Sequence, residues 1–338
     1  MSRTATPEAP HVESLQEDFE RAAEAAGGVA ELRLAVAAKP VRIRFAGARA
    51  AEALRPAFAH LETREDEPPA LTLHVWDSGT PRAEANAAGA SYYYEQDGVR
   101  ALHQPASDVF SVLTAEADTG WFWMPDANGL PYWDYTAPFR HLLSWWLDAQ
   151  GVRQVHGGAV GTEDGGVLLV GPGGSGKSTT ALSTLPDQRL CYAGDDYVAV
   201  GSGGAPAVHS LYSSGKVHPD DLHRLPHLEP ALADGTRPDE KAVFYVEQAF
   251  PGRSIAGFPL RAIVVPRVTD RRAARALPGT RAEVLAAFAP STIFQLHPPA
   301  RDALAWMAGL VRAVPTFVLE LGSDVETIPP ELLRILER

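Results

Sequence analysis

Cysteine is almost absent from this chain of 338 residues, since Cys191 is the only one. A single cysteine excludes an internal disulfide and fits a reducing compartment such as the cytoplasm. No stretch reaches the roughly 18 continuous apolar residues that a membrane-spanning helix needs. The N-terminal residues MSRTATPEAPHVESLQEDFE lack the apolar segment of a secretory signal and the arginine-rich pattern of a transit peptide. The sequence therefore predicts a cytoplasmic protein without a membrane partner.

Positive charge is also scarce, because 30 Lys and Arg residues face 42 Asp and Glu residues and leave a net charge of −12. Nucleic acids and anionic lipids are bound through basic surfaces, so the charge argues against both as partners. A small anionic ligand such as a nucleotide needs only a local basic cluster and stays compatible with the composition. Lysine is rare among the basic residues, with only Lys39, Lys177, Lys216 and Lys241. Arginine replaces lysine poorly where a compact point charge is needed, which draws attention to these four.

The pattern of expected helices and strands changes near residue 140, and no internal repeat or low-complexity run is visible. Residues 1–140 combine helical segments with short alternating strands, which predicts an N-terminal α+β domain. We expect helical structure over residues 12–38, interrupted at Gly27-Gly28, and over 52–62. We expect strands over residues 41–47, 71–77, 109–116 and 120–126, and a hairpin over 90–105 that turns at Asp97-Gly98. Five of the seven tryptophans lie between Trp121 and Trp146, which predicts an aromatic core, with an aromatic binding groove as the alternative.

Residues 141–338 alternate strands with helices, which predicts an α/β domain. A connecting helix is expected over residues 139–151, and a continuous apolar run over 258–268 is typical of a buried strand. Amphipathic helices are expected over 282–290 and 300–314, followed by a last strand over 316–322 and a proline-started helix.

The strongest motif is VLLVGPGGSGKSTTAL, in which Gly171 to Ser178 fit G-x-x-x-x-G-K-[ST]. An apolar strand precedes this stretch and a helix follows, as in a phosphate-binding P-loop (Walker A). Glycines let backbone N–H groups point at phosphate oxygens, and the helix N-terminus adds partial positive charge. In this arrangement Lys177 reaches the β- and γ-phosphates and Ser178 offers its hydroxyl to Mg²⁺. The expected nucleotide-binding residues of the motif are Gly171, Gly173, Gly174, Ser175, Gly176, Lys177, Ser178 and Thr179.

Two adjacent acids, Asp195 and Asp196, follow the next expected strand, 18 residues after Lys177. An acid at the tip of a neighbouring strand is the Walker B partner of a P-loop and holds Mg²⁺. Two neighbouring carboxylates also raise the pKa of one of them, which suits a general base. We favour Asp195 as the base and Asp196 as the metal ligand, although the reverse stays open. The alternative is a pair of solvated turn acids.

His156 lies just before the P-loop strand and is followed by two glycines, which would let the backbone approach a ligand. A lone histidine on a strand is more often a core residue than a ligand.

The segment after the acids offers further cations. Lys216, in the run Ser214-Gly215-Lys216, is either a second cation near the phosphates or part of a surface loop. Lys241 and Arg253 are candidates for neutralising the transferring phosphoryl group, with ordinary solvated charges as the alternative. His218, His223 and His227 follow irregular intervals without a cysteine, which argues against zinc.

Taken together, Val155-His156-Gly157, the loop Gly171 to Ser178 and Gly194-Asp195-Asp196 resemble the catalytic domain of bacterial HPr kinase/phosphorylase. The same order of motifs is similar to ATP-dependent phosphoenolpyruvate carboxykinase, which shares that P-loop fold. The resemblance covers about residues 152–200. It implies phosphate and Mg²⁺ binding by Lys177 and Ser178, metal binding and base catalysis by the acid pair, and a place for His156 beside the transferred phosphoryl group.

The glycine-rich segment that follows the HPr kinase core is not found here, nor is the arginine-rich substrate signature of the carboxykinases. The chain thus looks like an outlying relative, similar to HPr-kinase-like proteins found beside peptide-modifying enzymes, some of which phosphorylate a serine of a precursor peptide, including lasso-peptide precursors. The expectation is a P-loop kinase domain of the HPr kinase/carboxykinase type over residues 141–338, with a substrate- or partner-recognition domain over residues 1–140.

The predicted activity is an ATP- and Mg²⁺-dependent kinase that phosphorylates a hydroxyl, first of all a serine of a peptide or protein. Alternatives are a kinase of a small polar hydroxyl compound, a non-catalytic nucleotide-binding module, and a carboxykinase-type lyase. An exposed strand edge near residues 41–47 and 71–77, with Trp121 and Trp133 as anchors, would accept an extended peptide. A homo-oligomer stays open.

Overall fold

The computed structural model describes residues 11–77, 92–116, 118–201, 203–232, 241–295 and 302–338. The chain forms two compact units. The N-terminal unit contains Met1–Pro56 and Leu61–Trp146, and the C-terminal unit contains Ala57–His60 and Leu147–Arg338. A short segment of the first sixty residues therefore belongs to the second unit.

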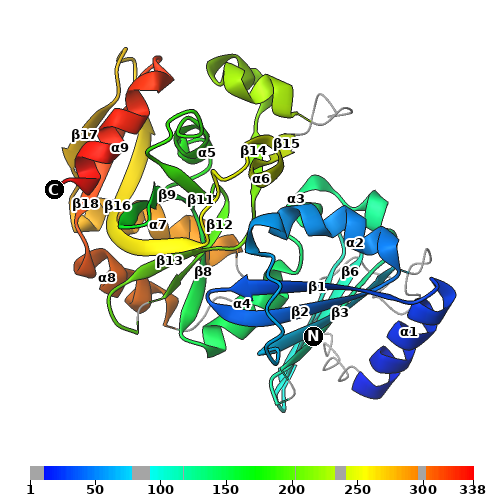
Figure 1. Cartoon of the computed structure of the whole chain (residues 1–338). Coiled ribbons are helices and arrows are strands. Elements are labelled where there is room, and N and C mark those ends of the chain that lie inside the picture. The colour runs from blue at the N-terminus through cyan, green and yellow to red at the C-terminus, as the bar shows by residue number, and fades with distance from the viewer. Residues whose placement is uncertain (1–10, 78–91, 117, 202, 233–240, 296–301) are drawn as a thin grey trace, which may run out of the picture. The chain divides into compact units, whose positions relative to one another are not determined.

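A seven-stranded mixed sheet forms the N-terminal unit (Figure 1). Its strands in spatial order are β1 (Val29–Val36), β2 (Lys39–Ala46), β3 (Leu71–Asp77), β7 (Thr119–Met124), β6 (Val109–Thr114), β5 (Val99–Gln104) and β4 (Tyr92–Gln96). The β2–β3 and β3–β7 pairs are parallel and the others antiparallel. The expected hairpin is confirmed: Asp97 and Gly98 join β4 to β5 with φ of 51° and 75°, the backbone that a two-residue turn of this kind needs.

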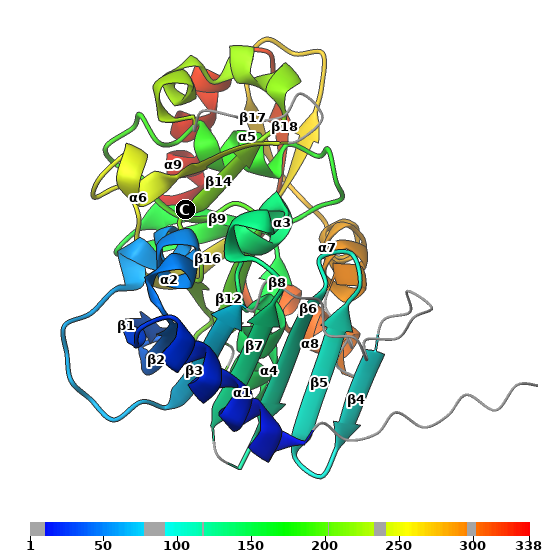
Figure 2. The ribbon, with the colours of Figure 1, turned by 90° about the vertical axis from the view of Figure 1, so that its right-hand side faces the viewer.

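Helix α1 (Val12–Ala25) lies across one face of this sheet (Figure 2). Its buried residues Leu15, Phe19 and Ala23 recur at helical spacing and pack into one cluster with three tryptophans of the sheet, Trp76, Trp121 and Trp123. The other face receives Phe139, which stacks edge-on against Phe122, at the start of α4 (Arg140–Ala149). Trp145 and Trp146 are buried as well, so the aromatic core is confirmed for four of these five tryptophans.

Two expectations for this unit are wrong. Residues 29–36 form β1 and not the continuation of a helix, because α1 ends before Gly27 and Gly28, both at positive φ, and Leu32, Leu34 and Val36 alternate into the core. Burial of an alternating face thus outweighs the helix preference of alanine and leucine. The expected strands 41–47 and 71–77 are interior strands, since β2 lies between β1 and β3 and β3 between β2 and β7, so neither offers an edge.

Residues 52–62 are helical in two parts. The α-helix α2 (Ala48–Leu54) gives way to the 3₁₀ helix η1 (Arg55–Leu61) at Pro56, which lacks the N–H that an α-helix requires. Beyond Trp123 come η2 (Ala127–Gly129) and α3 (Tyr132–Tyr135). Trp133 on α3 is 39% exposed and can meet a ligand, whereas Trp121 is 4% exposed and cannot anchor a peptide.

The C-terminal unit contains a nine-stranded sheet. Seven strands follow the order β11 (Cys191–Gly194), β9 (Gly158–Thr162), β10 (Gly165–Leu169), β16 (Gly257–Val268), β13 (Ala207–Ser210), β12 (Tyr197–Gly201) and β8 (Val152–His156). β18 (Thr316–Leu321) also pairs with β16, and β17 (Arg275–Pro278) pairs with β18. A separate two-stranded sheet joins β14 (Ser214–Val217) to β15 (Ala242–Tyr245).

Strand β16 is the centre of this unit, parallel to both β10 and β18 (Figure 1). Helices α5 (Lys177–Leu182) and α9 (Ile328–Leu336) contribute to the apolar cluster that contains Val264, while α7 (Arg281–Gln295) and α8 (Ala303–Ala313) contribute to the cluster that contains Ile263 and Val265. Successive residues of a strand point to opposite faces, so these helices cover both faces of the sheet. Because both faces of β16 are buried, its sequence is a continuous apolar run. The unit is therefore an α/β fold. The short elements η3 (Pro219–Arg224), η4 (Pro226–Ala231), α6 (Val246–Ala249) and η5 (Val325–Thr327) complete it.

The segment Ala57–His60 is held by the C-terminal unit through three contacts. The amide of Ser213 donates to the carbonyl of Ala57 at 2.8 Å, and the His60 ring shares a 2.6 Å hydrogen bond with the Ser210 hydroxyl. The Phe58 ring lies 5.6 Å from the Tyr212 ring, centre to centre.

No helix in the described part of the chain is long and apolar enough to cross a membrane.

Candidate functional site

The glycine-rich loop connects β10 to α5 at the carboxyl edge of the parallel strands. Gly171 and Gly176 have φ of 151° and 99°. The φ of 99° at Gly176 strains any residue with a side chain, and a Cβ there would also displace a methyl group of Leu321, so glycine is favoured at this position. Pro172, Gly173 and Gly174 are exposed, whereas Ser175 and Ser178 are half-buried. The loop therefore presents its backbone to solvent at the start of α5.

Lys177 folds back over this loop. Its ammonium donates to the carbonyls of Gly171 at 2.8 Å and Pro172 at 3.1 Å, and the residue is buried. Burial lowers the pKa of Lys177, and the charges of Asp196 and Asp195 oppose that effect. The cation is thus placed between the phosphate loop and the acid pair.

Asp196 lies in the turn between β11 and β12 and is paired twice. Its Oδ1 is 2.9 Å from Nε2 of His156, and its Oδ2 accepts a hydrogen bond from the ammonium of Lys216. Burial by itself would raise the pKa of Asp196, but the Lys216 cation and the His156 hydrogen bond outweigh it and hold the pKa well below its usual value. The carboxylate of Asp196 therefore stays ionised, and a quarter of its side chain reaches the surface.

Asp195 has the opposite environment. It is 2% exposed, and only its Oδ2 accepts a hydrogen bond, from the amide of Lys216 at 3.1 Å. The other oxygen, Oδ1, is buried with no hydrogen-bond partner. Burial first, and the Asp196 charge second, raise the pKa of Asp195 to about 6. When two neighbouring carboxyl groups have pKa values that differ strongly, one can serve as a base while the other stays ionised and binds a cation.

His156 reaches the acid pair through the pairing of β8 with β12, in which it lies opposite Tyr197. The amide of Gly157 donates to the carbonyl of Asp196 at 3.0 Å, which fixes the acid turn against the end of β8. The two glycines after His156 are explained by this packing: a Cβ at Gly157 would lie 2.7 Å from the Leu169 carbonyl, and one at Gly158 would lie 3.2 Å from that of Gly194. They make room for neighbouring backbone.

Lys216 is buried on β14, so the expectation that it belongs to a surface loop is wrong. It lies on β14, is 3% exposed, and pairs with Asp196. Burial lowers the pKa of Lys216, but the charge of Asp196 overcomes this effect and raises it. The only sequence signal for this buried ion pair is the rarity of lysine.

The remaining expected site residues lie in different places. Lys241 directly precedes β15, and its positive charge adds to the lowering of the Lys177 pKa and opposes the rise of the Asp195 pKa. Thr179 is buried within α5. Arg253 is not brought to the cluster, because its guanidinium donates to the backbone carbonyls of residues 185, 187 and 190, beyond the C-terminal end of α5.

A metal would need ligands from outside the acid pair. Among the described residues, no group of three or more His, Cys, Asp and Glu side chains could hold a metal ion, the histidines 218, 223 and 227 included. Mg²⁺ is a hard cation that keeps waters and substrate phosphate oxygens and takes only one or two protein ligands. The Ser178 hydroxyl and the ionised Asp196 fit that role, provided that Asp196 gives up one of its two partners or binds through water.

No protein-family model matches the chain, and no curated protein matches it. Among solved structures, the chain is similar to the HPr(Ser) kinase/phosphatase from Coxiella burnetii, with a TM-score of 0.30 and 10% identity over 55% of this chain and 96% of that chain. A likeness this weak carries no argument, so the function rests on the side chains themselves.

Proposed function

We propose that the protein is an ATP-dependent kinase that transfers the γ-phosphoryl group to a hydroxyl. The observation that carries the proposal is the acid pair that accompanies the glycine-rich phosphate loop. The pKa of Asp195 is raised and that of Asp196 is lowered, and the charges of both carboxylates act on Lys177 of the loop. A permanently ionised carboxylate and a carboxyl that titrates near neutrality are what metal binding and proton removal require.

The residues divide the work as follows. Loop N–H groups and Lys177 bind the phosphates, and Ser178 with Asp196 would hold Mg²⁺, which neutralises charge on the phosphate oxygens. The acceptor hydroxyl loses its proton to Asp195 as its oxygen bonds to the γ-phosphorus. The bond from that phosphorus to the bridging oxygen breaks, and ADP leaves with the electron pair. His156 and Lys216 keep Asp196 ionised and in place, and Lys241 adds positive charge.

Asp195 is the better base and Asp196 the better metal ligand. A carboxyl with a pKa of about 6 holds a transferred proton more readily than one whose pKa is depressed. Asp196 is the more exposed of the two and can meet a ligand. Because Oδ1 of Asp195 is buried, a substrate hydroxyl reaches it only when neighbouring side chains move.

The acceptor we propose is a serine of a peptide or protein, with a small polar hydroxyl compound as the second choice. A hydroxyl needs a base, whereas an ionised carboxylate does not. In the described sheet of the N-terminal unit, β4 is the edge strand that an extended peptide could join, because the outer edge of β1 already pairs with Glu62 and Thr63. Exposed Trp133 on α3 is an aromatic contact available in the same unit.

A non-catalytic nucleotide-binding module is the competing function. The observation that favours it is the closed state of the site, in which Lys177 binds the loop carbonyls and Oδ1 of Asp195 is sealed from solvent. A module that only binds has no use for the pKa difference between the two acids.

The test is incubation of lysate from the source organism with γ-labelled ATP and Mg²⁺, with wild-type protein or Asp195→Asn, followed by mass spectrometry of peptides and metabolites. We expect a labelled hydroxyl with wild type and none with the variant. Nucleotide binding without any transferred label in either sample would establish the binding module instead.

A further inference from the structure

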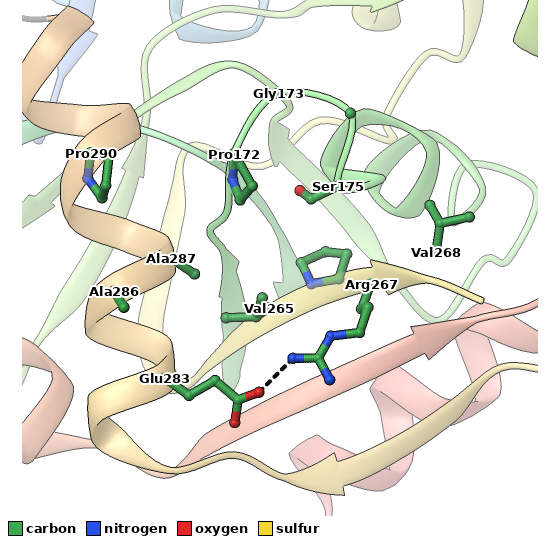
Figure 3. Close-up of a pocket in the computed structure, with 12 residues that line it drawn as sticks. Pro172, Gly173, Ser175, Val265, Arg267, Val268, Glu283, Ala286, Ala287 and Pro290 are labelled. Atoms are coloured by element: carbon green, nitrogen blue, oxygen red, sulfur yellow. Dashed lines mark hydrogen bonds and ion pairs between the residues drawn. The ribbon is translucent and has the colours of Figure 1, made fainter.

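The phosphate loop and the acid pair are carried by different elements of the C-terminal unit. The loop follows β10 and lines a cavity of about 540 Å³, which α7 lines as well (Figure 3). Neither Asp195 nor Asp196 lines this cavity, since both lie in the turn between β11 and β12. Phosphoryl transfer therefore requires a contact outside the two motifs that fixes the loop and the acid pair relative to each other.

Residues 183–190 connect the two motifs along the chain. They leave α5, whose first residue is Lys177, and lead into β11, which ends directly before Asp195. This connection consists of turns and contains neither helix nor strand. Its own hydrogen bonds are short in range, such as the 3.1 Å bond from the amide of Leu190 to the carbonyl of Asp187. Local turns of this kind do not set the spacing between a helix and a strand.

The side chain of Arg253 binds this connection at three points. Arg253 is half-buried in the turn between α6 and β16. Its Nε donates to the carbonyl of Leu185 at 3.2 Å, and its Nη2 donates to the carbonyls of Asp187 and Leu190. Leu185 and Leu190 are buried, so their carbonyls depend on partners from the protein. A guanidinium carries its donors in a rigid plane and can serve several carbonyls at once, whereas the compact ammonium of a lysine cannot span them.

The main chain next to Arg253 binds β11. The amide of Tyr192 donates to the carbonyl of Arg253 at 2.8 Å, and the amide of Ile255 donates to the carbonyl of Tyr192 at 2.9 Å. β11 is the last strand on its side of the described nine-stranded sheet, so these two bonds cover its outer edge. The same residues lead into β16, the central strand. Arg253 thus links the connection, the strand before the acid pair and the centre of the sheet.

We propose that Arg253 is a positioning residue, which holds Asp195 and Asp196 at the distance from Lys177 that phosphoryl transfer needs. The inference rests on the proposed function, because only a transfer reaction requires that spacing. Among the described residues, the guanidinium donates to the connection 183–190 and to neither motif. Arg253 therefore acts on the reaction through the connection.

Lysine in place of Arg253 would deprive the buried carbonyls of donors. The connection then loosens, and the acid pair moves relative to Lys177, while the phosphate loop keeps its own backbone. A misplacement of about 1 Å caused far from the chemistry can lower a rate by about 10²-fold. The loss should accordingly appear in kcat and not in the affinity for the nucleotide.

The experiment compares wild type, Arg253→Lys and the matched control Arg261→Lys as full chains. The guanidinium of Arg261 also donates to a backbone carbonyl, that of Asp164, at 3.1 Å from Nε and 2.8 Å from Nη2. Asp164 lies between β9 and β10, at the opposite end of β10 from the phosphate loop. The control therefore removes the same kind of bond from the same unit without touching the connection.

Two quantities are measured with Mg²⁺ and γ-labelled ATP: the ATP affinity, by calorimetric titration, and the release of labelled phosphate, with water in place of the acceptor hydroxyl. We expect Arg253→Lys to lower kcat by about 10- to 100-fold and to keep its ATP affinity within about 2-fold of wild type. Arg261→Lys should keep both quantities within about 2-fold. Amide hydrogen exchange of residues 183–192 should become faster in Arg253→Lys and stay unchanged in Arg261→Lys.

A wild-type kcat in Arg253→Lys, with faster exchange of residues 183–192, would show that Arg253 serves stability alone and would overturn the inference. A loss of ATP affinity as large as the loss of kcat would also overturn it, because the loop itself would then be disturbed. If Arg253→Lys loses its circular dichroism signal, Arg253→Gln takes its place, and failure of both to fold would assign Arg253 to the fold only. If wild type neither binds nor hydrolyses ATP, the proposed function fails and the inference fails with it.

Discussion

Replacing Asp195 by Asn should abolish phosphoryl transfer and, at neutral pH, make the C-terminal unit more stable. The carboxyl has an ordinary pKa of 3.8 and a pKa of about 6 in the folded protein. A rise of about 2 units at 1.36 kcal/mol each corresponds to about 3 kcal/mol by which folding disfavours the ionised form. Asparagine is neutral and can still accept the amide hydrogen bond of Lys216, so it avoids this penalty.

The sign of the pH dependence follows from proton binding. The folded carboxyl keeps its proton up to about pH 6, whereas the unfolded one releases it near 3.8, so the folded state binds more protons between these values. Stability due to this group therefore falls as the pH rises through that window. The stability gap between variant and wild type should open between about pH 4 and 6 and be complete above about pH 7. Wild-type transfer should rise over the same interval as the base ionises.

Amide hydrogen exchange of β11 and β12 is the suitable assay, because six of the seven tryptophans lie in the N-terminal unit and fluorescence would report on the wrong part. At pH 7.5, exchange limited by opening of this unit should be roughly 100-fold slower in Asp195→Asn than in wild type. Asp196→Asn is the matched control and should exchange faster, since it breaks the pair with buried Lys216. An Asp195→Asn gap that does not change between pH 4.5 and 7.5 would refute the reasoning.

Three further outcomes are expected. Lys177→Ala should lower transfer by on the order of 10²-fold or more without unfolding the chain, as measured by labelled-phosphate turnover; unchanged turnover would remove the loop from the mechanism. His156→Ala should reduce kcat more than nucleotide affinity, because the variant lacks the hydrogen bond that helps to keep Asp196 ionised and in place, and a lowered melting temperature with normal activity would make His156 a core residue. Phe58→Ala should destabilise the C-terminal unit by about 3–5 kcal/mol, seen as faster exchange in β13, while β2 of the N-terminal unit stays protected.

Most of the strands and helices can be predicted from patterns within short stretches of the sequence. The hairpin at Asp97-Gly98 and the buried strand β16 follow from turn chemistry and from a continuous apolar run, each of which is complete within about a dozen residues. The sequence alone favours a helix over residues 29–36, because their alternation becomes decisive only when β2 pairs beside them. Strand pairing between segments is not encoded in either segment alone.

The same distinction applies to the site. The phosphate loop and the acid pair are visible as contiguous motifs, whereas the buried pair of Lys216 with Asp196 joins residues 20 positions apart through strands of two different sheets. Arg253 is the opposite example. Its positive charge makes it a candidate phosphate ligand in the sequence, but in the structure its guanidinium donates to backbone carbonyls. The cavity beside the loop has no motif at all, because α7 and β16 meet there only in the folded protein.

Because Ala57–His60 belong to the C-terminal unit, this segment of the nascent chain leaves the ribosome well before the residues that it packs against. The partner of His60 is Ser210, 150 residues later. At about 5–20 residues per second, that partner is synthesised roughly 8–30 s after His60. During this interval Phe58, which is fully buried in the finished protein, has no native site to occupy. Slow elongation between these positions would lengthen the exposure of an aromatic side chain, so codon choice between residues 60 and 210 should affect the yield of folded protein in cells.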